Sequence, residues 1–296
     1  MGVYLFCGSK LFFQVLLYLL HAMPKLTKEQ KFLYSRVAML LFGVGWVLFA
    51  FAGLKGFSFW YGGFVLCFWL ALGCSNYAER TTLWLIANRP VPFLIFYAAI
   101  ASTFFLLDRM AIDAGLWFYP MYHGWLFVVG YLVWYPVAAF SVLEFFYFLI
   151  RVFGERLVFR HRKETFWHNT LDRIEGVAFL AMIGLIVWGA AASISPVLLF
   201  SVASVWILLA SMKLAFHVQN GRQTALLLAV TGFLVALLTE IPNTGSFEWV
   251  YLSAPVLNVL LWGVPLWMLL GWYCFTLISL RLWIFLALHP PHQINT

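Results

Sequence analysis

Three carboxylic acids stand where a membrane protein would carry chemically active groups. The sequence has only 11 Asp and Glu residues among 296. Asp108 and Glu240 each end a short apolar run, and Glu144 lies inside a longer one. An ionisable group at such a depth is costly and usually faces the interior of a helix bundle. A carboxylic acid kept neutral near pH 7 can donate a proton. We therefore predict Glu240 as a catalytic proton donor and Asp108 as a second catalytic acid.

These two acids begin loops that resemble each other. In each loop a tryptophan follows the acid after nine residues, and a tyrosine follows it after eleven. The four residues are Trp117 and Tyr119 in the first loop, and Trp249 and Tyr251 in the second. Both loops lead into apolar runs that contain a proline. The similarity predicts two four-helix halves related by an axis along the membrane normal, with a site at their interface. Chance similarity between two aromatic membrane interfaces is the alternative.

Ordinary electrostatics offers a competing interpretation of each acid. Asp108 is adjacent to Arg109, and Glu144 lies about two helical turns from Arg151. Either carboxylate would then be a structural partner of an arginine. Alternatively, Asp108 and Glu240 would be helix-end carboxylates solvated at the membrane surface.

The remaining polar residues predict no metal or nucleotide site. Asp113 and Glu248 lie deeper in the loops and are expected to be in water. The seven histidines are scattered, without the paired spacing of metal or haem ligands. Glycine-rich phosphate-binding motifs are absent from the sequence. We therefore predict no metal and no cofactor.

The composition requires a membrane protein built from helices. Hydrophobic residues make up 64% of the chain and charged residues 10%, against about 25% charged residues in an ordinary soluble domain. Lipid offers backbone groups no partners, so an all-α, polytopic transmembrane bundle is predicted. The apolar runs are 32–54, 57–75, 91–107, 125–150, 177–192, 196–216, 224–239 and 255–288. They predict about eight main spans, with 3–23 as a possible ninth. The last run exceeds one span, so it should bend near Pro265 or protrude.

The basic residues orient these spans. Of 18 Lys and Arg residues, 14 fall in alternate loops or at their borders, and the opposite loops hold only Lys55 and Arg109. This asymmetry predicts cytoplasmic loops of a multi-pass protein in the cell (inner) membrane, and not a nucleic-acid-binding protein.

The same pattern divides the chain into five segments. They are a hydrophobic and basic N-terminal stretch (1–31), a first four-helix repeat (32–150), a basic cytoplasmic connector (151–173), a second four-helix repeat (174–288) and a tail (289–296).

The second loop resembles a known family. It reads Thr244-Gly245-Ser246-Phe247-Glu248-Trp249-Val250-Tyr251, preceded by Glu240 and followed by Gly263-Val264-Pro265-Leu266-Trp267. This arrangement resembles the membrane-embedded carotenoid-biosynthesis proteins that include the carotenoid 1,2-hydratases. The first half, with Gly115-x-Trp117-x-Tyr119 followed by Pro136 and Glu144, is similar to the related lycopene cyclase domain.

This resemblance implies membrane lipid and a long polyene or isoprenoid substrate as partners. A neutral carboxylic acid would protonate a terminal double bond. Water would then capture the carbocation in a hydratase (a lyase), or a neighbouring double bond would capture it in a cyclase (an isomerase). Aromatic faces stabilise such a cation, and no redox cofactor is needed. The predicted substrate-binding residues are Trp117, Tyr119, Glu144, Asn243, Trp249, Tyr251 and Trp272, with Asn243 or Tyr119 holding water.

Two interpretations compete with an enzyme. One is a transporter or lipid-binding protein that uses the same cavity. The other is a non-catalytic subunit that packs its Trp and Phe residues against partner membrane subunits or pigments. A closed apolar cavity touching Glu240 and Asp108 favours the enzyme, whereas a polar path through the membrane favours transport. Acids in salt bridges or in water, with no cavity beside them, favour the subunit.

Overall fold

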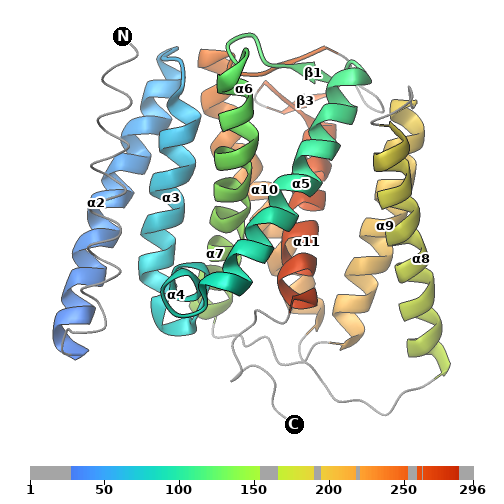
Figure 1. Ribbon diagram of the computed structural model, residues 1–296, viewed down its shortest axis with the longest axis horizontal. Coiled ribbons are helices and arrows are strands. Elements are labelled where there is room, and N and C mark those ends of the chain that lie inside the picture. The colour runs from blue at the N-terminus through green and yellow to red at the C-terminus, as the bar shows by residue number, and fades with distance from the viewer. Residues whose placement is uncertain are drawn as a thin grey trace.

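The computed structural model describes residues 28–153, 166–189, 195–217, 221–252, 259–261 and 263–286. Four of the five predicted segments fall wholly or partly outside these residues. The positions concerned are 1–27, which include the hydrophobic stretch at 3–23, then 154–165 of the basic connector, 190–194, 218–220, 253–258, 262 and 287–288 of the second repeat, and the tail at 289–296. The described chain is a bundle of helices that run between two ends, with short strands at one end only (Figure 1).

The first half of the chain begins with two long antiparallel helices. Its elements are α2 (Lys28–Leu54), α3 (Trp60–Asn76), η2 (Tyr77–Glu79), α4 (Thr82–Asn88), α5 (Pro90–Asp113), β1 (Trp117–Phe118), α6 (Trp125–Val129), η3 (Gly130–Trp134) and α7 (Tyr135–Val152). Helix α4 lies across the lower end of the bundle in Figure 1. The η3 turn is a π-helix directly before Pro136. Because proline has no N–H to donate, the regular ladder is interrupted there.

The second half adds four long helices and three strands. Its elements are α8 (Phe166–Gly189), α9 (Pro196–His217), α10 (Gly221–Ser246), β2 (Val250–Tyr251), β3 (Leu260–Leu261), β4 (Val264–Pro265) and α11 (Leu266–Phe285). Helices α8 and α9 form a pair on one side of the bundle, opposite α2 and α3 (Figure 1). Helices α10 and α11 lie between these two pairs.

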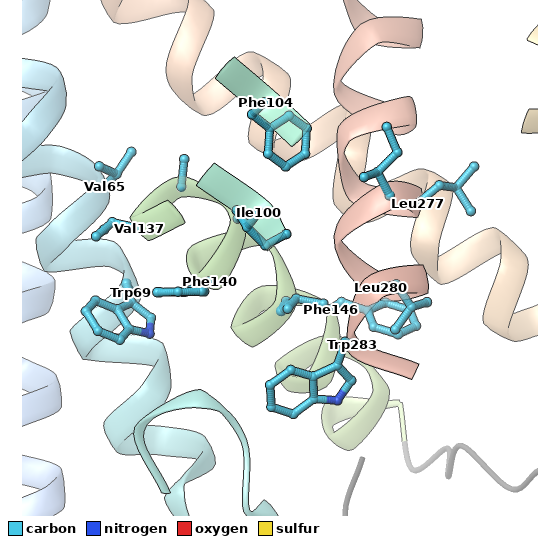
Figure 2. Packing of buried hydrophobic residues seen from close by; sticks show 14 of the residues in the cluster. Val65, Trp69, Ile100, Phe104, Val137, Phe140, Phe146, Leu277, Leu280 and Trp283 are labelled. Carbon is cyan, nitrogen blue, oxygen red and sulfur yellow. The ribbon is translucent and has the colours of Figure 1, made fainter. Parts of the chain in front are cut away.

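Large apolar side chains from α3, α5, α7 and α11 meet at the centre of the bundle (Figure 2). Phe140 of α7 packs against Trp69 of α3 and Phe96 of α5, with ring centroids 5.3 and 5.7 Å apart. Trp283 of α11 meets Phe96 edge-on at 5.3 Å. Close packing of large rings at these positions fixes how the four helices lie against one another.

One surface of helix α2 is apolar and exposed. Leu40, Leu41, Val44 and Leu48 each have 60–68% of their surface exposed. Among the residues that the structure describes, five segments are long and apolar enough to cross a membrane: Ser35–Leu54, Pro90–Asp113, Trp125–Val152, Gly221–Ser246 and Leu266–Ile284. The protein is therefore a multi-pass helical membrane protein whose outer helix faces contact lipid.

Each of the eight predicted apolar runs overlaps a helix in the described part of the chain, although eight spans remain a prediction. The prediction for the last run was wrong in one respect. Pro265 does not bend a long helix; it precedes the first residue of α11, and the chain before it forms the β3–β4 hairpin. An extended Pro265, with ψ of 127°, starts a helix because its ring fixes φ and its missing N–H is not needed there.

Basic residues gather at the end of the bundle opposite the strands. Helix α5 begins after Arg89, α7 ends after Arg151, and α10 begins beside Arg222, and these helix ends lie at the bottom of Figure 1. Lys55 and Arg109 border helix ends at the top. The strands, and the loops that contain the predicted site, lie at this less basic end.

Candidate active site

A cavity of about 220 Å³ opens between α5, η3, α7, α10 and α11, with further lining residues from α8 and α9. Asp108 and Glu240 both line it, and most of the other lining side chains are aromatic or aliphatic. The lining includes five of the seven predicted substrate-binding residues: Trp117, Tyr119, Trp249, Tyr251 and Trp272. Residues from both halves of the chain therefore contribute to one chamber.

A short antiparallel ladder brings the two acid-bearing loops together. Strand β1 pairs with β2, so that Trp117 lies opposite Tyr251 and Phe118 opposite Val250. The backbone N–H of Leu252 extends the pairing by donating to the carbonyl of Leu116 at 2.9 Å. The tryptophan of one loop and the tyrosine of the other thus become neighbours, as they must to share one cavity.

Asp108 is 3% exposed, and its hydrogen-bond partners in the described part of the chain are all aromatic side chains. The indole N–H of Trp117 lies 2.8 Å from Oδ1, and the hydroxyls of Tyr119 and Tyr135 lie 2.8 and 2.6 Å from the same oxygen. Tyr131 makes a very short hydrogen bond to Oδ2. Arg109 pairs with Asp113 at 3.1 Å, on the exposed side of α5, so the competing Asp108–Arg109 pair is not formed.

Glu240 is 2% exposed and has a corresponding set of partners. Trp249 donates its indole N–H to Oε2 at 3.0 Å, and Trp272 donates to Oε1 at 2.9 Å. The hydroxyl of Tyr251 also hydrogen-bonds the carboxyl group. In both loops, therefore, the tryptophan nine residues after the acid and the tyrosine eleven residues after it bond to that acid.

Asn243, predicted to bind substrate or water, instead hydrogen-bonds the backbone of Trp249. Its amide donates to the backbone carbonyl of Trp249 at 2.8 Å and accepts from the Trp249 N–H at 3.3 Å. Both ends of the amide are used within the loop, and Asn243 does not line the cavity. It holds the backbone of Trp249 so that the indole reaches Glu240.

Glu144 also lies away from the cavity, contrary to its predicted place among the binding residues. Its carboxylate accepts from the amide of Asn76 at 2.9 Å, and from both the backbone N–H and the hydroxyl of Thr82. The alternative partner Arg151 bonds Ser75 instead, at 2.5 and 2.6 Å. Through these hydrogen bonds Glu144 links α7 to the last residue of α3, Asn76, and to the first residue of α4, Thr82.

Glu248 was expected in water but is fully buried. It accepts from the hydroxyl of Tyr122 at 2.6 Å and from the backbone N–H of Tyr61 at 3.3 Å, in the first turn of α3. Unpaired N–H groups at a helix start favour an acidic partner. Burial nevertheless raises the pKa of Glu248 above its usual range, and these hydrogen bonds only partly oppose that rise.

Four tyrosines of the cavity lining were not predicted: Tyr61, Tyr122, Tyr131 and Tyr135. Tyr131 and Tyr135 are four residues apart, which places both on one face of the η3–α7 segment. That spacing was visible in the sequence. Nothing in it indicated that this face meets Asp108, because the contact crosses from one helix to another.

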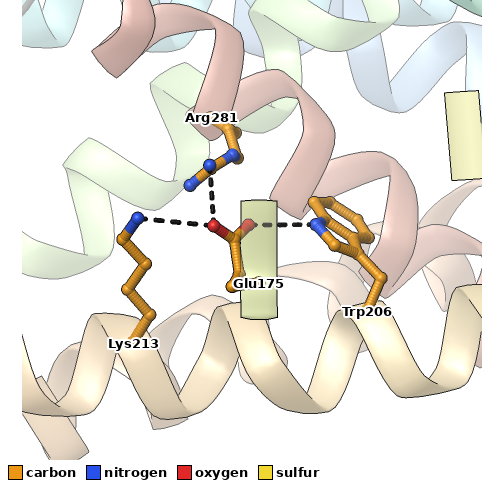
Figure 3. Close-up of polar contacts among 4 residues, drawn as sticks. All are labelled: Glu175, Trp206, Lys213 and Arg281. Carbon is orange, nitrogen blue, oxygen red and sulfur yellow. Dashed lines mark hydrogen bonds and ion pairs between the residues drawn. The ribbon is translucent and has the colours of Figure 1, made fainter. Parts of the chain in front are cut away.

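A different acid was overlooked at the basic end of the bundle. Glu175 of α8 is fully buried, pairs with Arg281 of α11 at 2.7 Å and with Lys213 of α9 at 3.3 Å, and accepts from the indole of Trp206 at 3.1 Å (Figure 3). Arg281 also lies over the ring of Phe179, at 5.3 Å. This ion cluster ties three helices together.

Within the described ranges, His, Cys, Asp and Glu side chains form no group of three that could hold a metal ion. No family model, curated protein or solved structure matches the chain.

Proposed function

We propose that this protein is an integral membrane enzyme of carotenoid or isoprenoid metabolism, in the cell membrane, that protonates a terminal double bond of a polyene. Asp108 and Glu240 supply the acid–base groups, and the aromatic lining receives the hydrocarbon. The observation that carries the proposal is that both acids face one largely apolar cavity and are held there by aromatic N–H and O–H donors.

The chemistry suits an apolar chamber. A protonated carboxyl group transfers its proton to the CH carbon of the terminal double bond. The π electrons form the new C–H bond, and the carbon that bears two methyl groups becomes a tertiary carbocation. Aromatic faces stabilise this cation through their quadrupoles, and Trp117, Trp249, Tyr251 and Trp272 line the cavity. Capture by water gives a hydrated product, and capture by a second double bond gives a ring.

The size of the cavity limits the part of the substrate that it can hold. An apolar cavity of roughly 150 Å³ binds one benzene molecule. A volume of about 220 Å³ therefore accommodates one end of a polyene, and the remainder of the chain extends toward lipid. This arrangement fits chemistry at a terminal double bond.

The resemblance of the loops to carotenoid hydratases and to the lycopene cyclase domain supports the same proposal. We further propose eight spans arranged as two four-helix halves, in which Asp108 with Trp117 and Tyr119 corresponds to Glu240 with Trp249 and Tyr251. The matched hydrogen bonds at the two acids favour this correspondence. A mainly apolar lining gives little support to transport of polar solutes.

Expression in a lycopene-producing host tests the function. Wild-type protein should convert part of the pigment to a product that has gained one water, or to an isomer of equal mass and different retention, detected by chromatography with mass analysis. Glu240→Gln should abolish conversion at equal protein level, and Asp113→Asn, an exposed acid on α5, should not. Pigments identical to those of an empty-vector strain would contradict the proposal.

A further inference from the structure

The hydrogen bonds around the two cavity acids differ in kind. Glu240 receives indole N–H groups on both oxygens, from Trp249 and Trp272. An indole N–H can only donate. Asp108 is surrounded mainly by tyrosine hydroxyls, which donate or accept equally well. Glu240 has one such hydroxyl, that of Tyr251, beside its two indole donors, so the environment of Asp108 adapts more readily to both the protonated and the ionised form of the acid.

The number of hydrogens available around Asp108 indicates whether this acid is protonated or ionised. Three oxygen atoms form a triangle: Asp108 Oδ1, the Tyr119 hydroxyl and the Tyr135 hydroxyl. Its sides are 2.8 Å from Oδ1 to Tyr119, 2.6 Å from Oδ1 to Tyr135, and 2.6 Å between the two hydroxyls. Each contact needs one hydrogen between its oxygens. The two tyrosines supply two hydrogens for three contacts, and Tyr131 is engaged at Oδ2.

We infer that Asp108 carries the third hydrogen on Oδ1, and that Asp108 rather than Glu240 is the proton donor. Each oxygen of the ring then donates one hydrogen and accepts one, in either direction around the triangle. Tyr119 and Tyr135 act as positioning residues that hold the acidic hydrogen. This assignment deepens the proposed function and reverses the order of the two acids expected from the sequence.

Charge at Glu240 supports the division of roles. Two carboxylates facing one apolar cavity repel each other, so one of them is favoured in the neutral form. The N–H donors at Glu240 stabilise its anion. The nearest basic side chain on α5, Arg109, is engaged by Asp113. A carbocation carries one positive charge, and the single negative charge at Glu240 balances it. A second negative charge at Asp108 is not needed for that balance.

The same donors also serve Asp108 after it has reacted. When its proton moves to the CH carbon of the terminal double bond, Tyr119 and Tyr135 can both turn their hydrogens toward Oδ1, where Trp117 already donates. The new carboxylate is then stabilised by four aromatic donors, including Tyr131 at Oδ2. Water that captures the cation releases one proton, which restores the acid. In cyclisation, the proton lost from a ring carbon does the same.

Infrared difference spectroscopy of the purified protein in lipid nanodiscs tests the assignment without turnover. Wild type minus Asp108→Asn should show the carbonyl band of one protonated carboxylic acid, which moves to lower wavenumber in D₂O. Glu240→Gln should keep that band and lose carboxylate absorption. Asp113→Asn, the matched control on the same helix, should leave the carbonyl band unchanged.

Tyr135→Phe provides a second test in case Asp108→Asn does not fold. It opens the ring but keeps the acid, so the carbonyl band should persist at a shifted wavenumber. A protonated-carboxyl band that vanishes in Glu240→Gln, or that is unmoved by Tyr135→Phe, would overturn the assignment. A wild-type protein that shows the Asp108 band yet converts no polyene would instead contradict the proposed function alone.

Discussion

Carboxylates are buried in two different ways at the two ends of this bundle. At the basic end, Glu175 is neutralised by Arg281 and Lys213, which hold α8, α9 and α11 together (Figure 3). At the opposite end, Asp108 and Glu240 have aromatic donors and face a cavity. An ion cluster fixes a structure, whereas an acid held by neutral donors retains a proton or a charge for use on a ligand.

Glu144 shows that neutral donors alone do not define a site. It is as deeply buried as Glu175, and Asn76 and Thr82 satisfy it. Unlike Asp108, it does not line the cavity described above. The combination of a neutral environment and an adjacent apolar space therefore distinguishes the candidate catalytic acids from structural ones.

Substitutions of the buried acids at the two ends of the bundle should differ most in their effect on turnover. Asp108→Asn should lower polyene conversion by about 10³-fold, within the range for loss of a general acid. Glu175→Gln should leave the activity per folded molecule nearly unchanged, because it lies in the ion cluster and not in the cavity lining. Conversion by detergent-solubilised protein, normalised to folded protein, measures both. Equal losses in the two variants would remove the distinction.

The same two substitutions should affect stability in the opposite order: Glu175→Gln should destabilise the protein more than Asp108→Asn. Glu175→Gln leaves Arg281 and Lys213 without their carboxylate, and we expect a loss of about 2 kcal/mol, since these side chains are 31% and 26% exposed. Asp108→Asn replaces a neutral acid by an amide of the same shape, and should cost less than about 1 kcal/mol. Thermal unfolding followed by tryptophan fluorescence measures both.

Arg109→Ala is the matched control for the ion cluster. It breaks an exposed pair with Asp113, whose side chains are 48% and 38% exposed, and should change stability by less than about 0.5 kcal/mol. A Glu175→Gln protein as stable as this control would mean that the buried cluster is not what holds the three helices.

The smallest expected effect concerns Glu248, the buried loop acid. Burial raises its pKa in the folded protein, so the folded state binds the proton more tightly than the unfolded state. Its contribution to stability is then full below the unfolded pKa of about 4.3 and is lost as pH rises through the folded pKa. The melting temperature should therefore fall less between pH 4 and 8 in Glu248→Gln than in wild type. Parallel curves for Glu248→Gln and wild type would contradict this.

Much of the site could be predicted from the spacing of residues along the chain. The positions of Trp117 and Tyr119 relative to Asp108, and of Trp249 and Tyr251 relative to Glu240, predicted residues that do line one cavity. These contacts span only nine and eleven residues, so a helix end and a short loop suffice to form them. Asn243 was misjudged because a short polar side chain in a loop bonds its own backbone as readily as it binds a ligand.

The sequence by itself determined that the chain forms apolar helices in a membrane, since uniformly apolar runs leave backbone groups no partner outside the helix. It also determined the two acid–tryptophan–tyrosine units. Only the tertiary structure decided which helix face meets which acid. Tyr131 and Tyr135 reach Asp108, Tyr61 and Tyr122 hold Glu248, and Arg281 reaches Glu175 across about a hundred residues. Such contacts depend on how helices distant in the chain pack together, and no local pattern encodes that.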